Sequence, residues 1–284
     1  MSSEEATFWD HLDELRKVFF RILIVVVLFT IIVFVNKGVL FDIVLAPHNA
    51  DFVTYRFFCS LAAVLEMPSL CPSYFHVDLI STQLTSQFVI HMTTALYAGI
   101  IVASPYILYQ LFRFISPALY ANEKKYSRRV VSYAFVLFFA GVLLNYFLIF
   151  PLSFRFLATY QISPEVINTI TIASYMDTFL MLSLLMGITF ELPVIAYFFA
   201  KFGFLTAGFM KKYRKHAVVV ILVIAAIITP TSDIFTLLLV SVPVYCLYEA
   251  SIWIVKKVSA GKNILGNGND NISEVSDSRF VEGK

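Results

Sequence analysis

Charged residues are scarce in this sequence. Asp, Glu, Lys and Arg make up 14% of its 284 residues, against about 25% in a typical soluble domain. Apolar types account for 59%, Phe alone occurs 29 times, and the mean hydropathy is +0.81. Because one soluble core cannot hide this much apolar surface, we predict that most of the chain is surrounded by lipid.

The sequence also lacks the motifs of catalysis and metal binding. It contains no GxxxxGKS/T phosphate loop, no HExxH pair and no GxSxG elbow. Its five His and three Cys are scattered and show no zinc-like spacing. We therefore expect no enzyme, no metal, no cofactor and no nucleic-acid partner. Any transport work must then draw on an ion gradient or on partner proteins.

Long apolar runs are what the sequence has in abundance. A hydrocarbon core of about 30 Å needs roughly 20 apolar helical residues, and six runs reach or approach that length. The sequence thus predicts an all-α polytopic membrane protein with six transmembrane helices. Five acidic residues among the first fifteen exclude a cleavable signal peptide, so the first run is a retained span. The predicted spans are residues 18–35, 86–112, 130–151, 177–200, 216–229 and 234–254.

The last two predicted helices are short. Residues 216–229 cover only about 21 Å at 1.5 Å per residue, and the next apolar run, 234–248, ends at Glu249. Such a pair thins the bilayer locally or sits in a recess of the protein. The alternative is that both helices extend into the flanking loops.

The positions of Lys and Arg predict the orientation. Eighteen of them fall on one side of the six-span arrangement, and only Lys37, Arg56 and Arg155 fall on the other. Since cytoplasmic loops carry the basic excess, we expect an N-in, C-in protein of the bacterial cytoplasmic (inner) membrane. Residues 1–259 would form the membrane domain. Residues 260–284, rich in Gly, Asn and Ser, would be a disordered cytoplasmic tail.

The first external loop, residues 36–84, is long and contains Cys59 and Cys71. It would face the oxidising side of a bacterial inner membrane. A disulfide between these two cysteines is expected, and it would contribute roughly 3 kcal/mol by restricting the unfolded chain. Cys246, in the last span, is expected to be a buried thiol.

Glu191 is a carboxylate near the middle of the fourth span, within ITFELPV. Such a position costs roughly 2.5–3.5 kcal/mol on insertion scales. Pro193 follows closely and cannot donate to the carbonyl of Thr189. These features favour a contact with a polar partner or cargo. A protonated Glu191 bonded to a neighbouring helix is the alternative.

Two further segments place acids beside the inner membrane surface. Residues 7–17, within TFWDHLDELRKVFF, predict a short amphipathic helix along that interface, with Glu14 free to meet a basic peptide. In the loop of residues 104–129, Glu123 precedes a group of Lys and Arg. Glu123 either contacts a ligand together with Phe114 or is an acid favoured by a helix dipole in a solvated turn.

Four motifs together resemble the TatC family, the multispanning core and receptor subunit of the twin-arginine protein translocase. They are HLDELRK, SPYILYQLFRFISPALYANEKK, GITFELPV, and ITPTSD followed by PVYCLYE, and they span about residues 7–257. The resemblance implies a receptor for twin-arginine signal peptides that exports folded proteins by means of the proton-motive force. It also implies single-span partner subunits of the TatA and TatB type, and self-association.

The resemblance assigns roles to matching residues. Glu14, Phe114 and Glu123 match residues that bind the signal peptide, and two carboxylates suit a pair of guanidiniums that each bind bidentately. Glu191 and Gln110 match intramembrane polar residues that contact partners. Pro47 and Asp233 match structural residues of the periplasmic loops. The sequence departs from the family in its longer first loop and in reading TPTSD rather than TPPD.

Two other functions compete with this interpretation. A proton-coupled secondary transporter of a small solute would use Glu191 as its proton site. It would also show internal repeats and further intramembrane charges, and the sequence shows neither. An assembly scaffold without a receptor role would keep cargo binding after replacement of Glu14 and Glu123.

Overall fold

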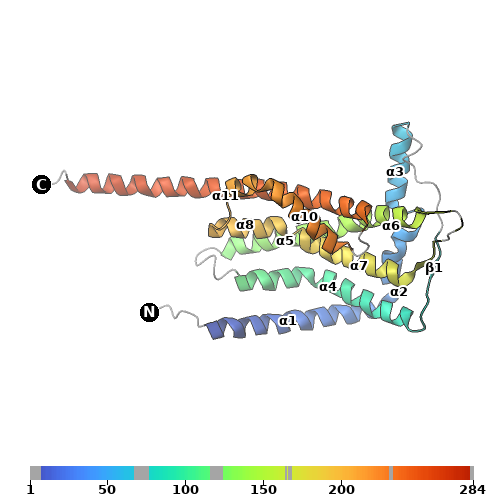
Figure 1. Ribbon diagram of the computed structural model, residues 1–284. Coiled ribbons are helices and arrows are strands. Elements are labelled where there is room, and N and C mark those ends of the chain that lie inside the picture. The colour runs from blue at the N-terminus through green and yellow to red at the C-terminus, as the bar shows by residue number, and fades with distance from the viewer. Residues whose placement is uncertain are drawn as a thin grey trace.

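The computed structural model describes the backbone of residues 8–66, 77–115, 124–163, 165, 168–229 and 233–281. Side chains are described over residues 12–66, 77–114, 130–163, 165, 168–229 and 233–259. Long helices run side by side, and α1 begins at the same end of the bundle at which α11 finishes (Figure 1). We call this the terminal end, and the opposite end, where α2, α3, α6 and β1 lie, the distal end.

Within the described residues, five helical stretches are long and apolar enough to cross a membrane. This confirms the prediction of an all-α polytopic membrane protein. The remaining predicted span, 216–229, corresponds to α10, which is shorter than the other five. The five stretches are Leu12–Val35, Ser86–Phe114, Val130–Thr159, Ile172–Phe202 and Ile234–Ser259.

The first span is the single helix α1 (Phe8–Val35), which packs along α4 (Ser86–Ile115). The predicted separate interfacial helix, residues 7–17, is instead the beginning of α1. No Gly or Pro interrupts residues 8–35, so nothing in the chain separates the amphipathic turns from the apolar ones. The two helices approach closely at Gly99, where an added Cβ would lie 2.9 Å from the Cα of Thr30.

The described residues of the long loop after α1 are largely helical. It forms α2 (Lys37–Leu45), the 3-10 turn η1 (Ala46–His48), α3 (Val53–Val64) and the strand β1 (Leu79–Ile80). The strand pairs in parallel with β2 (Ile170–Thr171). In Figure 1, α3 projects sideways, across the direction of the long helices.

The cysteines follow the prediction in part. Cys59, in α3, is disulfide-bonded, whereas its predicted partner Cys71 lies outside the described residues. Cys246 is free and exposed, so the prediction of a buried thiol is wrong. Its side chain points outward from α11, on a surface that lipid covers in a membrane protein.

The third span combines α5 (Lys124–Leu144), the π-helical turn η4 (Asn145–Ile149) and α6 (Phe150–Thr159). The fourth combines α7 (Ile172–Thr189) and α8 (Leu192–Phe202). α5 and α7 pack closely because both carry glycine at the contact. A Cβ at Gly141 would lie 2.6 Å from the carbonyl oxygen of Met186, and one at Gly187 would lie 2.8 Å from the ring of Phe138.

The chain ends in α9 (Ala207–Lys212), α10 (Arg214–Ile228) and α11 (Ile234–Val281). With 15 residues, α10 is about 22 Å long, as predicted for a short helix. The prediction is wrong for the last helix, whose apolar part extends over 26 residues to Ser259. α11 then continues to Val281 in place of the expected disordered tail, and no proline follows Pro243 to end it.

Candidate functional site

A polar cavity of about 370 Å³ lies between α1 and α4 at the terminal end. Its walls come from residues spaced three or four apart on each helix, and this spacing puts them on one helix face. The cavity therefore follows from the close packing of α1 against α4. It is lined by Asp13, Glu14, Lys17, Val18 and Arg21 of α1, and by Gln110, Arg113 and Phe114 of α4.

This cavity brings together two residues predicted from separate motifs, Glu14 and Phe114. It also includes Gln110, which the sequence grouped with Glu191. The side chain of Gln110 is only 4% exposed, and its Nε2 donates to the Tyr106 hydroxyl at 2.6 Å. Its Oε1 is buried and accepts no hydrogen bond within the described part of the chain. Glu123 lies outside the described residues.

The charges around the cavity are mixed. Asp13 and Glu14 are exposed carboxylates, while Lys17, Arg21 and Arg113 line the same space. Three cations against two acids give the lining of this cavity no net negative charge.

Glu191 lies at a break between α7 and α8, where it occupies the N-cap position of α8. Its carbonyl accepts from the backbone N–H of Val194 at 3.0 Å and from that of Ile195 at 2.9 Å. The side chain is 7% exposed, and neither carboxylate oxygen has a hydrogen-bond partner among the described residues. The alternative of a bond to a neighbouring helix thus has no counterpart in this part of the chain.

An apolar side pocket of about 390 Å³ lies next to this break. Pro193 and Val194, which directly follow Glu191 and Leu192, form part of its wall. The pocket lies among three helices, α5, α8 and α11. Its lining consists of Val130, Tyr133 and Leu137 of α5, Pro193, Val194 and Tyr197 of α8, and Ile254 of α11.

The two predicted structural residues of the loops lie at the distal end. Pro47 is buried in η1. The Tyr55 hydroxyl donates to the carbonyl of Pro151 at 2.9 Å and lies 3.3 Å from that of Pro47. Burial raises the pKa of Tyr55, against an opposing effect of Arg155, so the hydroxyl stays protonated at neutral pH. Asp233 caps α11, because its carboxylate accepts from the N–H of Thr236 at 2.7 Å.

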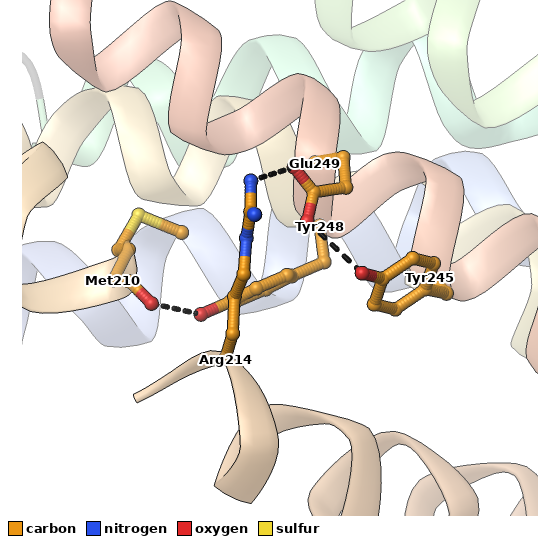
Figure 2. Close-up of polar contacts among 5 residues, drawn as sticks. All are labelled: Met210, Arg214, Tyr245, Tyr248 and Glu249. Carbon is orange, nitrogen blue, oxygen red and sulfur yellow. Dashed lines mark hydrogen bonds and ion pairs between the residues drawn. The ribbon is translucent and has the colours of Figure 1, made fainter. Parts of the chain in front are cut away.

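A second polar cluster, which the sequence did not predict, joins the last hairpin (Figure 2). Arg214, the first residue of α10, forms an ion pair of 2.6 Å with Glu249 of α11. The Tyr245 hydroxyl donates to the other carboxylate oxygen at 3.1 Å, and that of Tyr248 donates to the Met210 carbonyl at 2.8 Å. The only sequence signal was Glu249 itself, a charge that interrupts an apolar run without any visible partner.

Comparisons with known proteins agree on one family. A family model described as "Sec-independent protein translocase protein (TatC)" matches residues 10–243. The protein of that name from Blattabacterium is 37% identical over 91% of this chain and 98% of its own length. The Campylobacter jejuni protein is 35% identical over 88% of this chain and 93% of its own length. A crystal structure titled as the twin arginine translocase receptor TatC is also similar. It has a TM-score of 0.70 and 32% identity, and the match covers 88% of this chain and 99% of the crystallised one.

Proposed function

Because this chain belongs to the TatC family, we propose that it is the subunit of the Sec-independent translocase that receives twin-arginine signal peptides. The observation that carries the proposal is the cavity that unites Glu14, Gln110 and Phe114. A small-solute transporter is not favoured, since the relatives are translocase proteins and the similar structure is that of a receptor.

The cavity offers three kinds of contact to an arginine pair. Glu14 and Asp13 supply charged acceptors, and the buried Oε1 of Gln110 supplies a neutral one. The aromatic ring of Phe114 provides a face on which a guanidinium can stack. Glu123, which lies outside the described residues, would be the second fixed carboxylate, as the family resemblance implies. Lysine would bind less well, because an ammonium cannot form the paired, planar contact.

The same proposal includes the membrane topology. We place the terminal end in the cytoplasm of a bacterium, with six crossings and α10 as a short one. Support comes from described basic residues, since Arg113, Lys201 and Lys211 lie in the last turns of α4, α8 and α9 at the terminal end. The proton-motive force is proposed to drive the export of folded proteins, since the sequence has no phosphate-binding loop.

Glu191 and its side pocket are proposed to receive the single-span partner subunits of the TatA and TatB type. An apolar pocket of about 390 Å³ beside an unpaired, buried carboxylate suits a transmembrane helix that carries one polar residue. Replacement of Tyr197 by a photo-crosslinking residue should yield an adduct with such a subunit. The same photo-crosslinking residue at Val219, an exposed position on α10, is the control, and it should not yield this adduct.

The receptor proposal is tested by equilibrium binding of a fluorescent twin-arginine peptide to the purified full-length protein. Glu14→Gln should weaken binding about tenfold, since it removes one charge-assisted hydrogen bond in a partly exposed site. Glu165→Gln, which removes an exposed acid at the distal end, should leave the affinity unchanged. A twin-lysine peptide should bind the unmodified protein less tightly than the twin-arginine peptide does. Its affinity should also fall by a smaller factor on Glu14→Gln. Equal affinity of the unmodified protein and Glu14→Gln would contradict the proposal.

A further inference from the structure

Two side chains in the first turn of helix α3 donate hydrogen bonds to the third span. The Thr54 hydroxyl donates to the carbonyl of Phe147, and that of Tyr55 donates to the carbonyl of Pro151. Proline has no N–H, so Pro151 cannot donate to the carbonyl four residues earlier, which is that of Phe147. Thr54 supplies the missing donor. The base of α3 is therefore fixed to a specific level of the third span.

That level can be located along the span. Val130–Thr159 has 30 residues, about 45 Å of helix, which matches a bilayer including both headgroup regions. Phe147 and Pro151 are 12 and 8 residues before Thr159, or about 18 and 12 Å from the distal end of the span. With about 7 Å of headgroup region on each side, both carbonyls lie roughly 5–11 Å inside the hydrocarbon edge. Interfacial helices are buried about 5–10 Å into this boundary.

One face of α3 is apolar and exposed. Val53, Phe57, Leu61 and Val64 are 62%, 64%, 37% and 79% exposed, and their spacing of three or four residues aligns them in one row, which we call the outer row. The side chains of Thr54, Tyr55 and Ala62 are buried. Arg56 and Ser60 are exposed beside the outer row, which gives the helix a polar edge.

We propose that α3 is an in-plane membrane helix whose outer row lies in the acyl chains of the distal leaflet. Its orientation agrees, because α3 runs across the long helices (Figure 1) and thus along the membrane plane. The depth of α3 agrees with this placement, because the two carbonyls that accept hydrogen bonds from its first turn belong to a transmembrane span. At that depth lipid, and not water, meets an exposed Phe and three aliphatic side chains. Arg56 can reach from the polar edge toward lipid phosphates.

The proposal assigns a function to α3, which lies in the long first loop. An amphipathic helix beside the third span widens the contact of the protein with one leaflet, and its fixed base prevents it from rising into the water. The exposed apolar surface of the outer row is then ordinary lipid-facing surface, continuous with that of the spans.

Tryptophan quenching in reconstituted vesicles tests this placement. In a Trp9→Phe, Trp253→Phe background, Val64→Trp places a probe on the outer row. Ala63→Trp places a probe on the preceding residue, about 100° away around the helix axis. Phe57→Trp is a second outer-row probe. Gel filtration and helicity confirm that each variant is folded. Phosphatidylcholine brominated on its acyl chains should quench the two outer-row probes at least about twofold more strongly than Ala63→Trp, and aqueous acrylamide should show the opposite order.

Three results would overturn the proposal. Equal quenching of the Val64→Trp and Ala63→Trp probes by brominated lipid would show that the outer row has no preferred contact with acyl chains. Quenching of the outer-row probes chiefly by acrylamide would place α3 in water. Protection of the outer row from both quenchers would show that a second copy or another protein covers it.

Discussion

Gly141→Ala should destabilise the packing of α5 against α7. The new Cβ would lie 2.6 Å from the carbonyl oxygen of Met186 and 2.8 Å from Cγ of Phe190. An ordinary contact needs at least 3.4 Å, so the helices must separate by nearly 1 Å. The Met186 carbonyl also accepts from the N–H of Phe190 at 3.0 Å, in the turn just before Glu191. The substitution therefore strains the helix break that presents this carboxylate.

Overpacking of this kind costs about 1–3 kcal/mol. For a chain of this size, that corresponds to a fall of roughly 2–10 °C in the midpoint of thermal unfolding. The midpoint can be measured for the purified protein in detergent. Gly208→Ala is the matched control, because a Cβ there meets nothing within 4 Å and alanine favours the helix by up to about 1 kcal/mol. If Gly141→Ala is as stable as Gly208→Ala, the inferred tight contact between α5 and α7 is wrong.

Substitutions at three other contacts are expected to affect stability. Thr54→Val leaves the Phe147 carbonyl without its donor and should lower the free energy of unfolding by about 1–3 kcal/mol. Thr54→Ser keeps a hydroxyl and should restore most of this loss. Equal midpoints of thermal unfolding for the two variants would count against the hydrogen bond. Asp233→Ala removes the cap of α11 and should cost about 1 kcal/mol, while Asp233→Asn should cost much less. In a double-mutant cycle, Arg214→Ala and Glu249→Ala should show a coupling of at most about 1 kcal/mol, because both side chains are partly exposed, at 47% and 32%. A much larger coupling would show that lipid or a partner shields the pair.

Composition and flanking charge predicted the class of the protein because lipid imposes strong constraints on both. Predictions failed where a single residue was taken to mark a boundary. The last span was predicted as a short helix, 234–254, because Glu249 interrupts its apolar run, but α11 continues past it, in line with the alternative that the helix extends into the flanking segment. The amphipathic pattern of residues 7–17 appeared to be a separate helix, yet no helix breaker separates it from the span.

The site was predicted in the same uneven way. Motif positions identified Glu14 and Phe114 separately, and the packing of α1 against α4 brings them to one cavity. Gln110 was assigned the same kind of role as Glu191, as an intramembrane polar residue, and it lines the cavity together with Glu14. The helix break at Glu191 was indicated by Pro193. The depth of α3 depends on bonds to Phe147 and Pro151, which no local pattern reveals.

The central claim is that the cavity between α1 and α4 receives the arginine pair of a signal peptide, and photo-crosslinking tests it most directly. A photo-crosslinking residue in place of Phe114 should capture a twin-arginine precursor in membranes. The same residue at Phe209, exposed on α9, should not. Glu123→Ala should abolish the adduct at position 114 while membrane insertion of the protein remains intact, and Glu14→Gln or a twin-lysine precursor should reduce its yield. Adducts of equal yield from positions 114 and 209, or from twin-arginine and twin-lysine precursors, would contradict the account.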